Sequence, residues 1–355
     1  MPVKGFVAAV AMALATIASG DASAQVATPA PAPVAGAKPV TIERITVHSP
    51  AIEGNLEEES PDRAVLVVLP PSYRSSPRRR FPVVYALHGY SIGAEQWIGE
   101  IHVPQTIEGA FAKGAREMIL VLPDSKTAHD GSFYSSSVTV GDFETFVARD
   151  LVAYVDGHYR TLADRRSRGL AGHSMGGYGT ARIGMKHVDV FGALYMMSPC
   201  CLSTRALGMP DATTEKAVAA LRSPADSATL PWGLRAQLAT AAAWSPNPKA
   251  PPLFLDLPVK DGQPQPDVLA RWTANAPLAM LDQYVGNLRR YAAIGIDVGD
   301  RDGLKDDAAK LHAALDRYGI ANSFQVYPGD HTSGVAGRVQ DSMIPFFSRA
   351  LVFPK

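Results

Sequence analysis

One serine of the chain lies inside a dense cluster of glycines. The stretch GLAGHSMGGYG covers residues 169–179 and places Ser174 between Gly172 and Gly176 in a G-x-S-x-G pattern. Glycine fits where a bend leaves no room for a Cβ atom. A strand-like RGLA precedes the bend and a helical segment of small residues follows it, which is the setting that a nucleophile elbow requires. The pattern predicts that Ser174 is a nucleophile held on a strained turn.

A phosphate-binding glycine loop is the alternative interpretation of this stretch. Such a loop needs the lysine of G-x-x-x-x-G-K-[ST] or the spacing of G-x-G-x-x-G. Residues 169–179 contain neither, so the nucleophile interpretation is preferred. His173 is adjacent to Ser174 on the elbow and is expected to face the wrong way to act as its base.

A serine that attacks a carbonyl creates an oxyanion, which two backbone N–H groups would stabilise. Met175, directly after the nucleophile, is expected to supply the first of them. The second is expected in the loop after the apolar run 82–87, where Tyr90 is the first choice and Ser91 the second. His88 comes before the serine in the chain, so we expect it to support this loop and not to catalyse.

A serine nucleophile also needs a general base, which in this chain order follows both the serine and the acid. His331 lies in the loop sequence YPGDHT, directly after a predicted strand, and is the expected base. His187 follows the elbow helix too closely to reach back to Ser174. His312 lies in the middle of a helical pattern, where a solvated or packed histidine is the ordinary case.

The acid of such a site is expected in the loop after the penultimate strand. The last strand, 323–327, leads to His331, so the penultimate strand is the run 292–298. The run 292–298 leads into the sequence GDRDG, where Asp302 is the first choice and Asp300 the second. The chosen aspartate would hold the imidazole in the correct tautomer and stabilise its protonated form. Asp297 lies inside the strand and is expected to be structural.

No metal or organic cofactor is expected. A calcium loop is the competing interpretation of GDRDGLKDD, but with Gly303 as its glycine the first and last ligand positions would be Val298 and Ala309. Cys200 and Cys201, the two cysteines of the chain, are adjacent and cannot build a four-ligand zinc site unaided. A buried thiol pair and a vicinal disulfide both remain open for them.

The elements that position these residues follow from short apolar runs bounded by turn signals. Most runs are apolar on successive residues, which is typical of strands buried on both faces of a parallel sheet. Helical patterns between them predict an α/β fold with right-handed crossovers. The predicted strands are 64–69, 82–87, 118–122, 168–171, 193–197, 292–298 and 323–327, and the predicted helices are 142–156, 307–318 and 343–351.

Residues 202–290 interrupt this alternation with sequence rich in Pro, Ala and polar residues. Short helices over 214–221 and 266–274 are expected there. We interpret the segment as a lid-like insertion packed over one end of the sheet and not as an independent domain.

The N-terminal region has the composition of an export signal. Residues 1–24 combine a positive charge, a short apolar stretch and a small-x-small cleavage pattern, and residues 25–40 form an Ala/Pro-rich linker. The domain is then expected over 41–355, with no membrane span in the mature form. Lys and Arg together number 34, equal to Asp and Glu, which argues against a nucleic-acid partner.

With these residues placed, the chain resembles the putative-esterase family of α/β-hydrolases, which includes feruloyl and acetyl-xylan esterases, S-formylglutathione hydrolases and mycolyltransferases. The resemblance implies an α/β-hydrolase fold, with a mostly parallel central sheet and helices on both faces. By position it implies Ser174 as nucleophile, Asp302 as acid, His331 as base, and Tyr90 and Met175 as oxyanion donors. It is carried by residues 82–97, 142–161, 168–199, 296–304 and 327–333.

The expected function is that of an exported serine carboxylic-ester hydrolase, acting through an acyl-enzyme on a feruloyl, acetyl or other small ester, free or linked to a polysaccharide. The alternatives are a thioesterase or acyltransferase of the same family, an inactive binding protein with this fold, and a peptidase. Five aromatic residues could line an acyl pocket, although core packing is the ordinary role for any one of them: Trp97, Tyr134, Trp232, Trp244 and Trp272.

Overall fold

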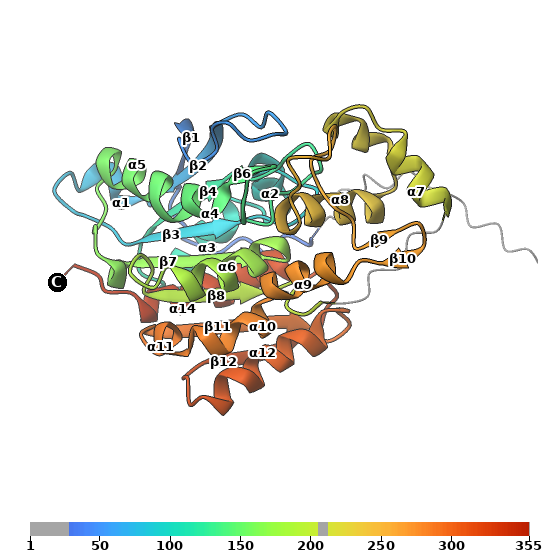
Figure 1. The fold of residues 1–355 in the computed structure, drawn as a ribbon. Coiled ribbons are helices and arrows are strands. Elements are labelled where there is room, and N and C mark those ends of the chain that lie inside the picture. Colours follow the sequence, from blue (N-terminus) through green and yellow to red (C-terminus); the bar gives the residue numbers. More distant parts are fainter. Residues whose placement is uncertain (1–27, 205–211, 355) are drawn as a thin grey trace, which may run out of the picture.

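A computed structural model describes residues 28–204 and 212–354 and contains an eight-stranded central sheet (Figure 1). Its strand order is β1-β2-β4-β3-β7-β8-β11-β12. The first two pairings are antiparallel and all the others are parallel, which confirms the predicted mostly parallel sheet. The strands are β1 (Thr41–His48), β2 (Asp62–Leu69), β3 (Val83–Leu87), β4 (Ile119–Pro123), β7 (Arg168–His173), β8 (Ala193–Met197), β11 (Ala293–Gly299) and β12 (Ser323–Tyr327).

Strands β3, β4 and β8 consist of apolar and aromatic residues throughout, because both of their faces are covered. Along β3, Val83, Tyr85 and Leu87 belong to one hydrophobic core, whereas Val84 and Ala86 belong to a second core on the opposite face. This alternation is the two-residue period of a strand. The sheet contains all seven predicted strands, as β2, β3, β4, β7, β8, β11 and β12.

Strand β1 is absent from the predicted set. It pairs with β2 at the edge of the sheet, and most of its residues are partly or fully exposed. Its sequence, TIERITVH, mixes polar and apolar residues, so it lacks the continuous apolar run that marks the buried strands.

Helices cover both faces of the sheet. Helix α6 (Met175–Lys186) packs on β3, β7 and β8, and α12 (Lys305–Arg317) packs on β11 and β12. The other face is covered by α2 (Ala94–Glu100), α3 (Gln105–Ala112) and the run α13 (Val335–Arg338), η5 (Val339–Met343) and α14 (Ile344–Ala350). The predicted helices at 307–318 and 343–351 are thus confirmed within a few residues.

The predicted helix 142–156 is divided by a π-helical turn. It consists of α4 (Phe143–Thr145), the π-helical η1 (Phe146–Asp150) and α5 (Leu151–His158). Short elements elsewhere complete the body: α1 (Ser72–Ser75), η2 (Arg165–Ser167) and the small hairpin of β5 (Ser136–Ser137) and β6 (Gly141–Asp142).

The described part of the insertion is largely helical. It contains α7 (Ala212–Ala219), η3 (Pro224–Thr229), α8 (Trp232–Trp244), β9 (Val259–Lys260), β10 (Gln263–Pro264), α9 (Pro266–Asn275), α10 (Pro277–Met280), η4 (Leu281–Gln283) and α11 (Val285–Leu288). Figure 1 shows α7, α8, β9 and β10 gathered at one end of the sheet, whereas α10 and α11 pack against α6. The two predicted helices are present as α7 and α9.

Helix α8 is the main element of the insertion that the sequence patterns miss. Its sequence, WGLRAQLATAAAW, is rich in alanine, and its residues 238–244 are all buried. A helix that is buried nearly all round has no polar face, so the usual apolar periodicity is weak. The Ala242 carbonyl of α8 accepts a hydrogen bond from Ser137 Oγ at 2.5 Å, which attaches the insertion to the body.

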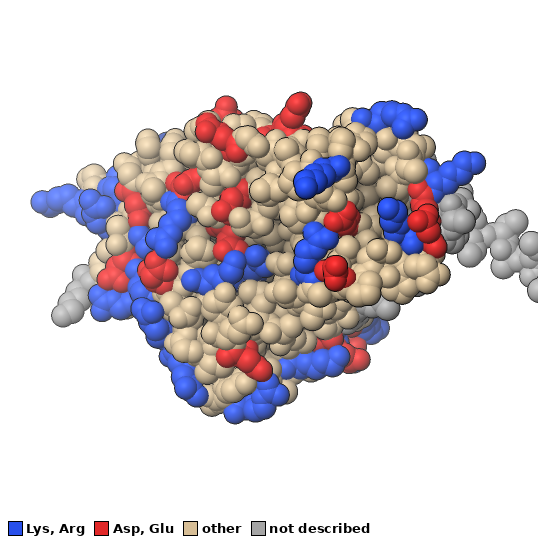
Figure 2. All heavy atoms as spheres, in the orientation of Figure 1, with Lys and Arg blue, Asp and Glu red and all other residues tan. Residues whose placement is uncertain are grey.

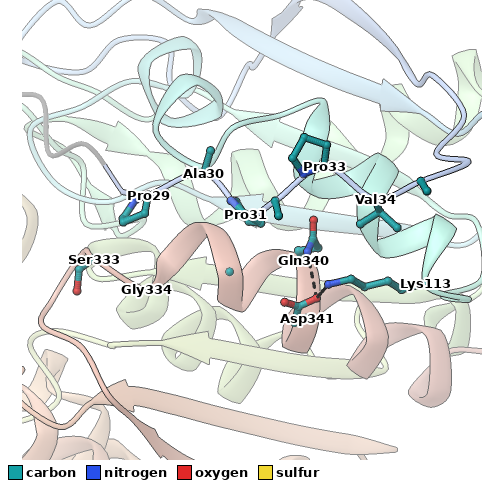
Figure 3. A pocket seen from close by; sticks show the side chains of 13 residues that line it. Pro29, Ala30, Pro31, Pro33, Val34, Lys113, Ser333, Gly334, Gln340 and Asp341 are labelled. Carbon is teal, nitrogen blue, oxygen red and sulfur yellow. Dashed lines mark hydrogen bonds and ion pairs between the residues drawn. The ribbon is translucent and has the colours of Figure 1, made fainter.

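Residues 28–40, the described part of the predicted linker, lie against the body without helix or strand. Val40 N–H donates to Glu108 Oε1 at 3.0 Å, and Gln105 Nε2 donates to the Pro31 carbonyl. Between this segment and helices α13 and η5 lies a groove of about 640 Å³ (Figure 3). The predicted signal peptide and the first residues of the linker lie outside the described residues.

The surface carries both signs of charge. Figure 2 shows Lys and Arg side chains interspersed with Asp and Glu over the face in view. Within residues 28–204 and 212–354, every helix is too short or too polar to cross a bilayer.

Candidate active site

Ser174 lies on a sharp turn between β7 and α6. Its backbone angles are φ 56° and ψ −114°, a left-handed conformation that a residue with a Cβ rarely adopts. Two glycines make the turn possible. A Cβ on Gly172 would lie 2.2 Å from the Gly176 carbonyl oxygen, and a Cβ on Gly176 would lie 2.0 Å from that of Leu87. The turn is therefore packed against the end of β3 and has no room to relax.

His331 contacts both Ser174 and Asp302. Its Nε2 atom lies 2.9 Å from Ser174 Oγ, and its Nδ1 atom lies 2.9 Å from Asp302 Oδ2. If Nδ1–H donates to the carboxylate, Nε2 presents a lone pair that accepts the serine hydroxyl proton. The structure thus brings these three predicted residues into one hydrogen-bonded chain.

The environment of Asp302 keeps its carboxylate ionised next to the His331 ring. Its side chain is 2% exposed, against 38% for His331. Burial by itself raises the pKa of this carboxyl. The hydrogen bond and charge of His331, with the Leu304 N–H donor, outweigh burial and hold the Asp302 pKa below its ordinary value. A carboxylate that stays ionised stabilises a cation on the neighbouring ring.

Asp300, the second choice for the acid, has different partners. Its Oδ1 accepts a hydrogen bond from Gly329 N–H at 2.9 Å and lies 3.3 Å from Arg301 Nη1. The Gly329 donor lowers its pKa. Asp300 therefore ties the loop after β11 to the loop after β12, and only Asp302 reaches the imidazole.

Asp297 is structural, as expected from its place inside β11. The side chain is fully buried and accepts hydrogen bonds from Tyr195 Oη at 2.6 Å and Arg338 Nε at 2.8 Å. Burial raises the pKa of its carboxyl, and the Arg338 guanidinium opposes that rise.

The two expected oxyanion donors lie next to the elbow. Met175 is the first residue of α6, where backbone N–H groups have no acceptor within the helix. The loop of Tyr90 abuts Ser174, since a Cβ on Gly89 would lie 3.5 Å from Ser174 Cβ. Ser91, the alternative donor, already gives its N–H to the Asp130 carbonyl at 3.1 Å.

His88 supports the Tyr90 loop, which is the role the sequence predicts for it. Its Nε2 accepts from Ser125 N–H at 2.8 Å, and its Nδ1 donates to the Gly89 carbonyl at 2.8 Å. Burial lowers the pKa of His88 and keeps the ring neutral. The imidazole thus joins the ends of β3 and β4 behind the site.

His173 has a role that the sequence patterns do not indicate. Its Nε2 donates to the backbone carbonyl of His331 at 2.8 Å, and the two ring centroids are 4.8 Å apart. Burial lowers the pKa of His173 to about 3, so the ring is a neutral donor. It faces the His331 loop and holds it in place. Its position at the carboxyl end of β7, beside Ser174 and the His331 loop, is the available signal.

The two other histidines weighed as bases have structural partners. His187 Nε2 lies 3.1 Å from Glu144 Oε1, and His312 Nδ1 lies 2.7 Å from Asn322 Oδ1. Neither contacts Ser174. In the part of the chain that the structure describes, no group of three His, Cys, Asp or Glu side chains could hold a metal ion.

The five aromatic residues considered for an acyl pocket fall into two groups. Trp97, Tyr134, Trp244 and Trp272 are all buried, and Trp97 belongs to the core on the opposite face of the sheet. Trp232, at the start of α8, is 56% exposed, and its ring centroid lies 5.4 Å from that of Tyr90. Trp232 alone among the five thus presents an open aromatic surface beside Tyr90.

A model of the family described as putative esterase matches residues 59–335. The chain belongs to the putative-esterase family. An esterase of Mycobacterium tuberculosis is 33% identical over 131 residues, which are 36% of this chain and 27% of that protein. The match thus spans about a quarter of the length of this curated relative.

Solved structures of similar fold include a ferulic acid esterase, with a TM-score of 0.64 and 23% identity, covering 88% of this chain and 99% of that one. An S-formylglutathione hydrolase from Staphylococcus aureus has a TM-score of 0.54 and 16% identity, covering 90% of this chain and 100% of its own. At these identities the likeness concerns the fold. It confirms the predicted α/β-hydrolase fold.

Proposed function

We propose that the protein is a serine carboxylic-ester hydrolase in which Ser174 is the nucleophile, His331 the general base and Asp302 the acid. The observation that carries this proposal is the unbroken hydrogen-bonded chain from Ser174 Oγ through the His331 ring to Asp302 Oδ2. Membership of the putative-esterase family supports the same reaction class.

In the proposed reaction, His331 Nε2 takes the proton of Ser174 as Oγ attacks the ester carbonyl. The Met175 and Tyr90 N–H groups stabilise the tetrahedral oxyanion. The protonated His331 then gives its proton to the departing alcohol, which leaves an acyl group on Ser174. A water molecule, deprotonated by His331, attacks this acyl-enzyme and releases the acid. No metal or organic cofactor takes part.

The proposed substrate is a feruloyl, acetyl or other small carboxylic ester, free or attached to a polysaccharide. The exposed ring of Trp232 beside Tyr90 supports an aromatic or sugar group at the entrance, since both pack well on an indole face. We also propose export, with residues 1–24 as the signal peptide, on the composition of that segment.

The proposal is tested by Ser174→Ala with p-nitrophenyl acetate as substrate. We expect turnover to fall by about a millionfold in kcat, to the background left by binding and the oxyanion donors. Circular dichroism and the thermal midpoint are the controls for folding, and a fluorophosphonate probe should label the wild type and not the variant. Retained turnover in a folded Ser174→Ala variant would contradict the proposal.

A substrate panel then separates the acyl and alcohol parts. Feruloyl, acetyl and short-chain esters and a thioester, each at matched concentration, give kcat/KM ratios that report differential binding in the transition state. Preference for a thioester over every oxygen ester would contradict the proposed ester class while leaving the roles of Ser174 and His331 intact.

A further inference from the structure

Two thiols lie beside the proposed nucleophile. Cys200 and Cys201 follow β8 in the loop next to the elbow, and both are half-buried free cysteines. The two thiols are hydrogen-bonded to each other, with 2.8 Å between their sulfur atoms. Both side chains therefore point to the same side of the loop, although neighbours in an extended chain point to opposite sides. Cys201 has a φ of 58°, which produces this arrangement.

The thiol pair is connected directly to Ser174. Cys200 N–H donates to the Ser174 carbonyl at 3.1 Å, and Ser174 N–H donates to the Met197 carbonyl at 3.0 Å. The Ser174 turn is thus held from both sides by the end of β8 and its loop. The loop has little freedom, because a Cβ on Gly177 of α6 would lie 2.8 Å from Pro199 Cα.

We propose that Cys200 and Cys201 form a reversible thiol–disulfide site for small-molecule disulfides, and that their oxidation to a vicinal disulfide slows turnover at Ser174. The effect on turnover rests on the proposed function of Ser174, whereas formation of the disulfide does not. The chain has no other cysteine, so no other internal disulfide competes with this one.

The exchange proceeds in two balanced steps. The Cys201 thiolate attacks a disulfide R–S–S–R, forms a mixed disulfide with one half and releases the other as a thiolate, which takes up a proton. Cys200 then loses its proton, attacks Cys201 Sγ and expels the second R–S⁻. In total, two protein thiols become one disulfide and the reagent becomes two thiols. Cys201 acts first because the hydrogen bond between the two thiols, followed by burial, raises the pKa of the Cys200 thiol, which therefore keeps its proton longer.

The bond is expected to be readily reversed. Adjacent Cα atoms are about 3.8 Å apart across a trans peptide, whereas disulfides usually join Cα atoms about 4.4–6.8 Å apart. The resulting strain makes a bond between neighbours easy to reduce, which suits a regulatory site better than a structural one. Closing the ring shortens the Sγ–Sγ distance from 2.8 Å to about 2.0 Å, and we expect this shift to disturb the hydrogen bond from Cys200 N–H to the Ser174 carbonyl.

The test places the purified full chain in glutathione buffers of increasing disulfide content. Intact mass distinguishes the free thiols from the vicinal disulfide, which has lost two hydrogens, and from a mixed disulfide, which has gained a glutathione. Turnover of p-nitrophenyl acetate and the rate of fluorophosphonate labelling are measured on the same samples. We expect turnover to fall at least about threefold on oxidation, since displacements of about 1 Å near reacting groups cost up to about a hundredfold. Dithiothreitol should restore it.

Two variants serve as controls. The double variant C200S/C201S should show the same turnover at every glutathione ratio. Cys201→Ser should form at most a mixed disulfide at Cys200 and never the internal one. Free thiols at all ratios, or a vicinal disulfide with unchanged turnover, would overturn the proposal. An inactive but reversibly oxidised wild type would instead contradict the function of Ser174 and leave the disulfide site standing.

Discussion

The parallel sheet and the insertion position their residues in different ways. At the sheet, the groups that meet at His331 come from the ends of β7, β11 and β12, three strands linked by β8 and by backbone hydrogen bonds. The insertion joins the body largely through side chains, such as Ser137 on Ala242 and the ring of Trp232 against Tyr90. Hydrogen-bonded backbone ladders hold groups rigidly, whereas a single substitution can change one side-chain contact without altering the backbone. The sheet therefore suits the fixed geometry that the proposed chemistry needs, and the insertion suits selectivity.

Within this comparison, the largest effect is expected to distinguish the two aspartates of the loop after β11. Asp302→Asn keeps the shape but leaves the His331 ring without a carboxylate, and kcat should fall by about ten thousandfold. Asp300→Asn, two residues earlier in the same loop, should change kcat by less than about tenfold, because its partner is Gly329 N–H. Steady-state kinetics on p-nitrophenyl acetate checks both. Equal losses in the two variants would contradict the assignment of Asp302.

The next effect concerns how the elbow helix is attached to the body. Glu144 of α4 contacts Arg182 and Lys186 of α6 at 2.9 Å. Burial alone would raise its pKa, but the His187 hydrogen bond and these two cations lower it from 4.5 to about 2. Because the folded-state pKa is depressed, this stabilisation is present above about pH 4.5 and is lost as the pH falls toward 2.

Glu144→Gln should therefore lower the free energy of unfolding by about 3 kcal/mol at pH 7, because it leaves Arg182 without its anion. The difference between wild type and variant should shrink as the pH falls from 5 to about 3. Urea unfolding at several pH values measures it. A constant difference across this range would show that the charge of Glu144 is not its cause.

A smaller effect is expected at the entrance to the site. Trp232→Ala should raise KM for a feruloyl ester about threefold to tenfold, the size of one aromatic contact, and alter KM for an acetyl ester less. Trp232→Phe should recover much of the loss. Equal changes in KM for the two esters would show that Trp232 does not contact the part of the substrate in which they differ. That result would also contradict the view that the insertion provides selectivity.

The smallest effect tests a single link between insertion and body. Ser137→Ala removes the hydrogen bond to the Ala242 carbonyl and the one that Ser137 Oγ accepts from Thr139 N–H, and should cost about 1 kcal/mol of stability, with little change in kcat. Ser136→Ala is the matched control, since Ser136 is exposed. Thermal denaturation of the three proteins checks the order, and a Ser136 effect as large as that of Ser137 would contradict it.

Local patterns determined the sheet and the elbow from sequence alone. The apolar runs are strand signals because both faces of those strands are buried, and Gly172 and Gly176 flag the turn because no Cβ fits there. His331 could be singled out because it follows a strand at the edge where parallel strands end. These signals depend on neighbours in the chain, so they can be read without the fold.

Only the tertiary structure decided which side chains from distant segments of the chain contact one another. The sequence GDRDG made Asp302 the first choice over Asp300 without deciding between them. In the fold, the Gly329 N–H from another loop donates to Asp300, whereas His331 contacts Asp302. Four other features also could not be predicted from the sequence. They are the edge strand β1, the all-round burial of α8, the support that His173 gives to His331, and the pairing of the Cys200 and Cys201 sulfurs beside Ser174. Each arises from contacts between segments far apart in sequence or from a backbone turn that no residue type by itself requires.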